Sequence, residues 1–203
     1  PYTTLFRSAS LAAACTGGRV ASVARPGWFT NENYFDEKNG MYEEMPVFPK
    51  NIVMVGDDYI DRGIWNEFFG DTTIKNRGIT YDATEHVLYR IDKIAAGKPA
   101  KIFVSAGWND VLHETPETAI VENLDQIFSH IHKVSPKTTC YWLNIVCAPS
   151  LTVGQLAAAE AVNAKLAGMA EKGGFEVIDI NAVLKDGIAD GRYSWDGGKL
   201  LNG

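Results

Sequence analysis

An apolar run that stops at a glycine and two carboxylates is the feature that most limits the possible folds of this chain. Residues 52–55 are all apolar, and Gly56, Asp57 and Asp58 follow before a segment of helical period begins. This pattern predicts a buried strand that leads through a tight turn into a helix. In open α/β sheets, ligands bind outside the carboxyl ends of the strands. Asp58 is therefore the first candidate for a functional side chain.

Four further short segments read as strands, and segments of helical period separate them. We expect strands at 51–55, 72–76, 101–106, 139–146 and 175–180. We expect helices at 60–69, 82–96, 117–134 and 153–172, and a short one that begins at 181. Parallel strands need right-handed crossover connections, which are usually helices. The alternation predicts an α/β fold, a three-layer α/β/α sandwich around a doubly wound, parallel, five-stranded sheet.

The segment before the first predicted strand has a different composition. Residues 1–50 are rich in glycine, asparagine, proline and aromatic residues, so we expect an irregular lead-in to a domain at 51–203. Residues 1–8 resemble a translated sequencing adapter, as found in assembled metagenome reads, and are left out of the fold. Residues 11–15, Leu-Ala-Ala-Ala-Cys, loosely resemble a lipoprotein cleavage site, so export is one interpretation. The chain ends directly after its last motif, so we expect truncation at the C-terminus.

The composition excludes several partners. The chain of 203 residues has a formal charge of −6 and no basic stripe, which argues against nucleic acid. No apolar run approaches the ~20 residues that span a bilayer. The three cysteines lack metal-ligand spacing, and no glycine-rich phosphate loop is present, so we expect neither metal nor cofactor. The sequence sets no oligomeric state.

Four turns stand where they could converge on one end of the predicted sheet. They are Gly56–Tyr59, Arg77-Gly78, Gly107–Asp110 and Trp195–Leu200. In order, spacing and context they resemble the SGNH, or GDSL-like, hydrolase family, from Asn51 to the last residue. The resemblance implies a flavodoxin-like SGNH-hydrolase fold and hydrolysis of acyl or acetyl esters of lipids or carbohydrates, with a small-molecule or carbohydrate ester as the partner.

The resemblance also implies a role for each turn. The family has a nucleophilic serine where this chain has Asp58, and a catalytic histidine where it has Lys199. Gly78 and Asn109 match the two residues whose N–H groups bind the oxyanion. Asp196 matches the aspartate that orients the histidine.

The two replacements remove the groups that acyl transfer needs. Asp58 offers no hydroxyl, and its negative charge opposes the oxyanion that must form beside it. Lys199 is protonated at neutral pH, because the ordinary pKa of lysine is about 10.4. We expect negligible ester hydrolysis, and an ion pair between Asp58 and Lys199 with the charges about 4 Å apart and Asp196 as a second anion.

Two other functions stay open: an active esterase with an unorthodox nucleophile, and a non-catalytic carbohydrate-binding or structural module. Aromatic residues flank the predicted cleft, where they either pack its rim or stack on a sugar ring or acyl chain. These residues are Tyr59, Tyr81, Trp108 and Trp195.

Several of these residues also have a purely structural interpretation. Asp57 is expected to anchor its turn through backbone hydrogen bonds, and Gly78 is alternatively a turn glycine with positive φ. The histidines are expected to be structural, and His113 is the one nearest in sequence to the cleft.

Overall fold

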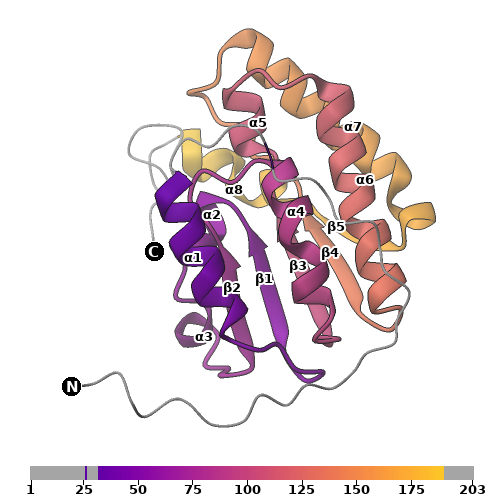
Figure 1. Cartoon of the computed structure of the whole chain (residues 1–203). Coiled ribbons are helices and arrows are strands. Elements are labelled where there is room, and N and C mark those ends of the chain that lie inside the picture. Colours follow the sequence, from indigo (N-terminus) through magenta and orange to yellow (C-terminus); the bar gives the residue numbers. More distant parts are fainter. Residues whose placement is uncertain (1–25, 27–31, 190–203) are drawn as a thin grey trace, which may run out of the picture.

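Five parallel strands form the centre of the molecule (Figure 1). The computed structural model describes residues 26 and 32–189. The strands follow the order β2-β1-β3-β4-β5 across the sheet, and each neighbouring pair is parallel. They are β1 (Ile52–Gly56), β2 (Ile74–Gly78), β3 (Lys101–Ser105), β4 (Thr139–Leu143) and β5 (Phe175–Ile178). The predicted doubly wound α/β fold is confirmed.

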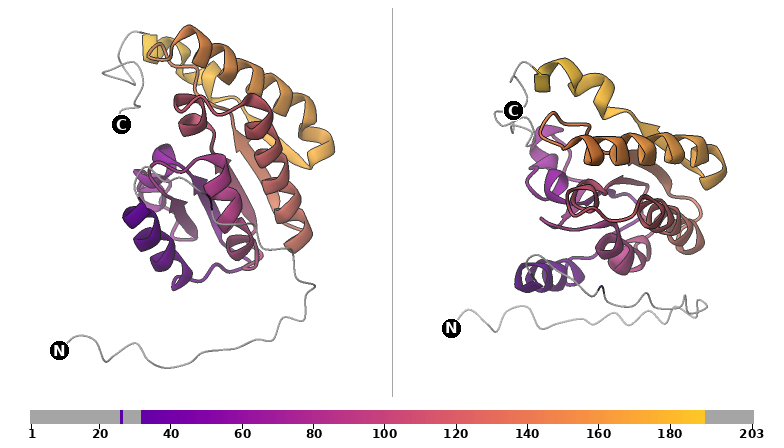
Figure 2. Two further views of the ribbon diagram at one scale, coloured as in Figure 1. Left: turned by 45° about the horizontal axis from the view of Figure 1, so that its top comes forward. Right: turned by 90° about the horizontal axis from the view of Figure 1, so that it is seen from above.

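Helices cover both faces of this sheet, as the views in Figure 2 show. One face carries α2 (Asp58–Asp61), α3 (Trp65–Phe68) and α8 (Ile180–Ala189). The other carries α1 (Glu32–Glu43), α4 (Thr84–Ala95), α6 (Glu117–Val134) and α7 (Val153–Gly173). The short helix α5 (Trp108–Leu112) follows β3 at the carboxyl end of the sheet. None of the described helices is long and apolar enough to cross a membrane.

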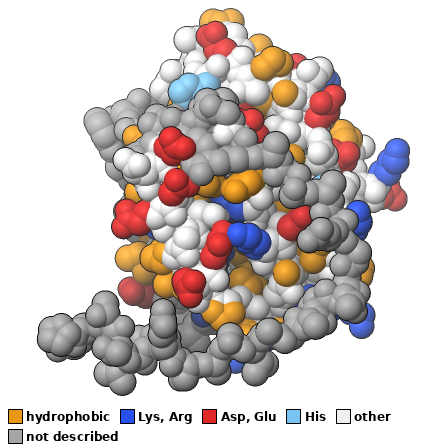
Figure 3. Space-filling model, viewed as in Figure 1, with side chains coloured by type: hydrophobic (Ala, Val, Ile, Leu, Met, Phe, Trp, Pro, Cys, Tyr) orange, Lys and Arg blue, Asp and Glu red, His pale blue; other side chains and the backbone are white. Residues whose placement is uncertain are grey.

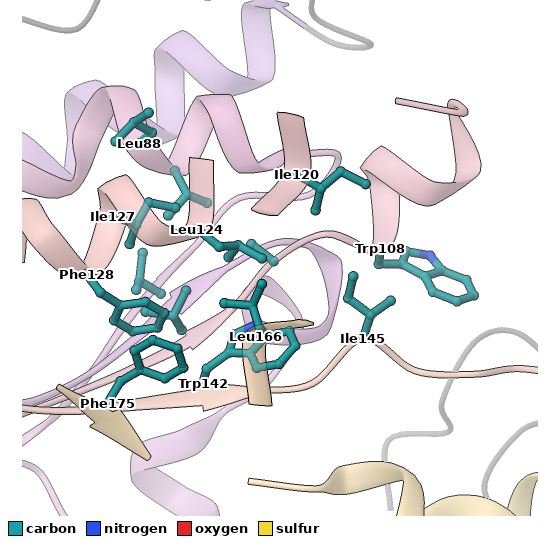
Figure 4. Packing of buried hydrophobic residues seen from close by; sticks show 14 of the residues in the cluster. Leu88, Trp108, Ile120, Leu124, Ile127, Phe128, Trp142, Ile145, Leu166 and Phe175 are labelled. Carbon is teal, nitrogen blue, oxygen red and sulfur yellow. The ribbon is translucent and has the colours of Figure 1, made fainter. Parts of the chain in front are cut away.

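Alternate residues of each strand point to opposite faces and build two cores of unequal size. Val53 and Val55 belong to the larger core, which α4, α6 and α7 cover, whereas Met54 packs with Ile60 and Ile74 in the smaller one. Figure 4 shows the larger core, where the rings of Phe128 and Phe175 stack with their centroids 4.0 Å apart. Burial on both faces explains why β1 reads as a continuous apolar run.

The strand predicted at 139–146 ends at Leu143, the helix α5 was not predicted, and two larger differences concern other helices. The lead-in was expected to be irregular, but residues 32–43 form α1; Phe35 is its one buried residue, so it has little apolar periodicity. The helix predicted at 60–69 is interrupted at Gly63, which separates α2 from α3. Phe68 and Phe69 of this segment are 58% and 67% exposed. Their helical spacing therefore does not mark a buried face.

Candidate active site

The turn after β1 is fixed between two strands. Asp57 caps α2, because its Oδ1 accepts a hydrogen bond of 3.1 Å from the Tyr59 N–H. Its own N–H donates to the Ser105 carbonyl at 3.1 Å. Gly56 is required here, since a Cβ at this position would overlap the Ser105 carbonyl oxygen. The turn therefore holds Asp58 at the carboxyl end of the sheet, and Asp57 anchors the turn as predicted.

Asp58 receives two hydrogen bonds on a single oxygen. The Tyr81 backbone N–H and the Asn109 side-chain amide both donate to its Oδ2, each at 2.9 Å. Among the described residues, Arg62 makes a long contact of 3.5 Å with Asp58 Oδ1. Two N–H groups that converge on one oxygen have the arrangement of an oxyanion hole. The carboxylate of Asp58 occupies the position between these two donors.

Asn109 is held in place by a second hydrogen bond. It lies in α5 and is 4% exposed, and its Nδ2 also donates to the Asp82 carbonyl at 3.0 Å. The helix begins after Gly107, whose φ of +116° reverses the chain at the end of β3. The amide is thus directed at Asp58 by both the turn and the hydrogen bond, which agrees with its predicted position at the site.

Gly78 does not supply the backbone donor that the sequence suggested. Its N–H donates to the Asn76 side chain at 2.7 Å, and Gly78 is not among the residues that line the cavity. Its φ is not positive either. A Cβ at Gly78 would overlap the backbone of α2, so the glycine permits the close packing of α2 on β2.

The backbone donor is Tyr81, three residues later. Tyr81 has a φ of +72°, a conformation that few residues other than glycine adopt. The sequence indicated Tyr81 only as an aromatic residue at the rim. No residue pattern marks a tyrosine at positive φ, so its N–H could not be identified without the structure.

A cavity of about 590 Å³ opens beside Asp58 and Asn109. Tyr59, Tyr81 and Trp108 line it as the sequence predicted, and Ser105 and Arg62 add polar groups. The remaining lining is mostly apolar and comes from α2, α3, α5, α8, the end of β4 and the residues beside them: Ile60, Gly63, Trp65, Phe68, Phe69, Leu112, Leu143, Ile180 and Leu184. Trp195, Asp196 and Lys199 lie outside the described residues, and so does the predicted ion pair with Asp58.

Three buried carboxyl groups lie beneath the site. Burial raises the pKa of Asp57 well above its usual value, and the nearby charge of Asp58 adds to this effect. Burial also raises the pKa of Asp110. Asp82 has a pKa of about 7, because burial outweighs its 2.7 Å ion pair with Arg90. The charge beneath the site therefore changes with pH near neutrality, through the titration of Asp82.

Arg90 ties the ends of two strands together. It donates to the Gly56 carbonyl at 3.1 Å and to the Arg77 carbonyl at 2.6 Å. Gly56 is the last residue of β1 and directly precedes the turn that carries Asp58. The buried guanidinium therefore fixes the point at which this turn leaves the strand.

Two of the described histidines, His86 and His130, make contacts that stabilise the fold. His86 is buried and its Nδ1 accepts the Ala83 N–H at 2.8 Å. His130 lies 2.9 Å from Asp92. His113 caps the end of α5 and is not among the residues that line the cavity.

Comparisons with known proteins give a consistent family. The sequence model of the GDSL-like lipase/acylhydrolase family matches residues 56–200. No curated protein matches the chain significantly. A protein from Streptococcus pneumonia, provisionally described as a platelet activating factor, is 24% identical with a TM-score of 0.68, over 83% of this chain and 86% of its own.

Two other solved structures share the fold at lower identity. A lipolytic G-D-S-L family protein from Veillonella parvula DSM 2008 is 20% identical with a TM-score of 0.62, over 75% of this chain and 90% of its own. Phospholipase A1 from Streptomyces albidoflavus NA297 is 16% identical with a TM-score of 0.57, over 72% of this chain and 86% of its own.

Proposed function

Because this chain belongs to the GDSL-like lipase/acylhydrolase family, we propose that it keeps the ligand cleft of that family but does not hydrolyse esters efficiently. One observation carries the proposal: the Asp58 carboxylate accepts both the Tyr81 N–H and the Asn109 amide. An ester carbonyl oxygen would need these same two donors in the transition state.

The chemistry of a carboxylate at this position supports the loss of activity. Asp58 has no proton for a base to remove, and it is a weak nucleophile toward an unactivated ester. A carbonyl oxygen could reach Tyr81 and Asn109 only by displacing Asp58. The negative charge would then stand beside the developing oxyanion and raise the energy of the transition state.

The lining of the cavity favours an acyl or alkyl chain as the ligand. Leucine, isoleucine and aromatic side chains surround it, and few polar groups face it. A sugar would leave many hydroxyl groups without partners there, at a cost in free energy for each. A chain of CH₂ groups gains about 0.8 kcal/mol for each group that it buries.

The proposal includes an ion pair between Asp58 and Lys199, with Asp196 beside the lysine. It is supported by the state of Asp58 Oδ1, whose ion-pair contact with the half-exposed Arg62 is 3.5 Å long. An ammonium group could approach this oxygen without disturbing the hydrogen bonds on Oδ2.

Hydrolysis of p-nitrophenyl acetate tests the proposal. The unmodified chain should show no turnover above buffer, whereas the double variant Asp58→Ser with Lys199→His should gain measurable turnover. Adding Asn109→Ala to the double variant should lower its kcat about 10²–10³-fold, the usual effect of removing one oxyanion donor. Turnover by the unmodified chain that Asn109→Ala abolishes would show that the site is active as it stands.

A binding measurement tests the other half of the proposal. Titration with 1-decanol should change the tryptophan fluorescence, because Trp65 and Trp108 line the cavity. The change should be smaller in Leu184→Arg, which places a charge in the apolar lining. A fluorescence signal that 1-decanol leaves unchanged would contradict the proposed ligand.

A further inference from the structure

The helix α1 lies before the residues that match the family, yet it contacts the turn that carries the oxyanion donor. The family match begins at residue 56, and α1 ends at Glu43. In Figure 1 α1 crosses in front of β2, and Figure 2 shows it on the opposite face of the sheet from α2. We propose that α1 is a working part of the site, in which Tyr34 and Lys38 act through Asp61 to position the Tyr81 N–H. This inference rests on the proposed role of that N–H as a donor in the cleft.

Asp61 is the residue that connects α1 to the turn. Its Oδ2 accepts the Tyr34 hydroxyl at 2.5 Å, and its Oδ1 pairs with Lys38 Nζ at 2.7 Å. The same Oδ2 accepts the Thr80 N–H at 3.0 Å and the Thr80 hydroxyl at 2.7 Å. The Asp61 side chain is only 4% exposed. One buried carboxylate thus joins two side chains of α1 to the residue directly before Tyr81.

The turn needs such support because Tyr81 is strained. A residue other than glycine at positive φ costs roughly 1–2 kcal/mol and persists only where its neighbours fix it. Holding the Thr80 N–H and hydroxyl fixes the residue that precedes Tyr81. The Tyr42 hydroxyl, near the other end of α1, donates to the Gly78 carbonyl at 2.8 Å. Both attachments lie before Tyr81, one at Gly78 and the other, through Asp61, at Thr80.

Polar contacts dominate the attachment of α1. Phe35 is its one buried residue, whereas Lys38 lies 5.7 Å and 5.4 Å from the ring centroids of Tyr34 and Tyr42. Acidic side chains gather on the outer surface of this face of the molecule (Figure 3), where Asp36 and Glu37 are exposed. A helix held mainly by hydrogen bonds to one turn is suited to orienting that turn.

The charge state of Asp61 favours the same interpretation. Burial acts to raise its pKa, but hydrogen bonds from Lys38, Tyr34 and Thr80 outweigh this and hold the pKa below its usual value. The carboxylate is therefore ionised at neutral pH. Hydrogen bonds to charged groups are stronger than those between neutral groups.

Backbone NMR of the full chain with Tyr34→Phe tests the inference. This variant removes the hydroxyl and keeps the ring. Loss of a hydrogen bond to a charged group should accelerate amide exchange at Tyr81 by about tenfold or more relative to the Val55 amide in the core. The ¹⁵N shift of Tyr81 should also move. Lys38→Gln should act in the same direction.

Tyr89→Phe is the matched control, because Tyr89 also lies beside Phe35, with ring centroids 6.3 Å apart. It should leave the Tyr81 amide unchanged. Equal acceleration of Tyr81 and Val55 in Tyr34→Phe, or none at Tyr81, would overturn the inference.

A kinetic measurement separates this inference from the proposed function. In the double variant Asp58→Ser with Lys199→His, Tyr34→Phe should lower kcat for p-nitrophenyl acetate about tenfold and leave KM nearly unchanged, as expected for a weakened transition-state contact. An unchanged kcat would overturn the inference. If the double variant has no turnover, the proposed function fails, and the exchange rate of Tyr81 still decides the role of α1.

Discussion

Asp58 takes the place between Tyr81 and Asn109 that the proposed function assigns to an ester oxyanion. Both N–H groups lie 2.9 Å from its Oδ2, and Arg62 lies 3.5 Å from its Oδ1. The side chain therefore acts as a bound carboxylate that the chain itself supplies. Removing it would leave three nitrogen donors around an empty position at the end of an apolar cavity.

This arrangement predicts a gain of function in Asp58→Ala. Decanoate should bind this variant at least about tenfold more tightly than it binds the unmodified chain, because its carboxylate can take up charge-assisted hydrogen bonds. Asp58→Asn should show no such gain, since its amide still occupies the position. Isothermal titration calorimetry at pH 7 measures all three proteins, and equal affinities would refute the prediction.

The residues of the site could be predicted to different extents. The motif order indicated Asp58 and Asn109, and the structure brings them into hydrogen-bonding distance. It indicated Gly78 for the backbone donor, but glycine at that position serves close packing against α2. The direction of the Tyr81 N–H depends on a strained, positive φ. The residue type does not indicate this conformation.

At the scale of elements, apolar periodicity predicted the helices that cover the larger core. In α6 the buried residues are all apolar and lie on one face: Ile120, Leu124, Ile127, Phe128 and Ile131. Periodicity failed for α1, which has one buried residue, and for α3, whose apolar residues line the cavity. The apolar spacing of a helix therefore predicts buried residues only when that apolar face packs against the core.

The difference between the buried residues of α6 and the exposed residues near α3 predicts different effects of substituting two isoleucines. Ile127 is fully buried in α6, and Ile127→Ala should lower the free energy of unfolding by about 2–5 kcal/mol through lost burial and a residual cavity. Ile64 precedes α3 and is 55% exposed, so Ile64→Ala should change it by less than about 0.5 kcal/mol. Urea denaturation measures both, and similar losses would show that α3 packs more tightly than described.

For the whole molecule, the buried carboxyl groups predict how stability depends on pH. Asp57, Asp82 and Asp110 have pKa values raised by burial, above the value of about 3.9 in an unfolded chain. Between those values the folded state binds more protons than the unfolded state. The free energy of unfolding should therefore fall as pH rises from 5 through 7.

Asp61 acts in the opposite sense at lower pH. Its pKa is lowered in the folded state, so its contribution to stability is present above pH ~4 and is lost as pH falls through the folded value. Stability should therefore be highest in mildly acidic solution.

Asp57→Asn isolates one of these groups. It keeps the side-chain oxygen that accepts the Tyr59 N–H and removes a titrating carboxyl. Because burial raises the folded-state pKa of Asp57, the loss of stability between pH 5 and 8 should be smaller in this variant than in the unmodified chain. Asp71→Asn is the control, since Asp71 has a lowered pKa and should leave this pH range unaffected. An identical pH slope in Asp57→Asn and the unmodified chain would contradict the assignment.

The contact between Gly56 and the Ser105 carbonyl separates two kinds of loss that lie two positions apart in the chain. Any side chain at residue 56 would force β1 from β3, so a substitution there destroys the architecture. The side chain at residue 58 instead lines the cavity, so it can change without moving the strands. The glycine of the motif therefore reports on the scaffold, and residue 58 reports on the chemistry that the scaffold presents.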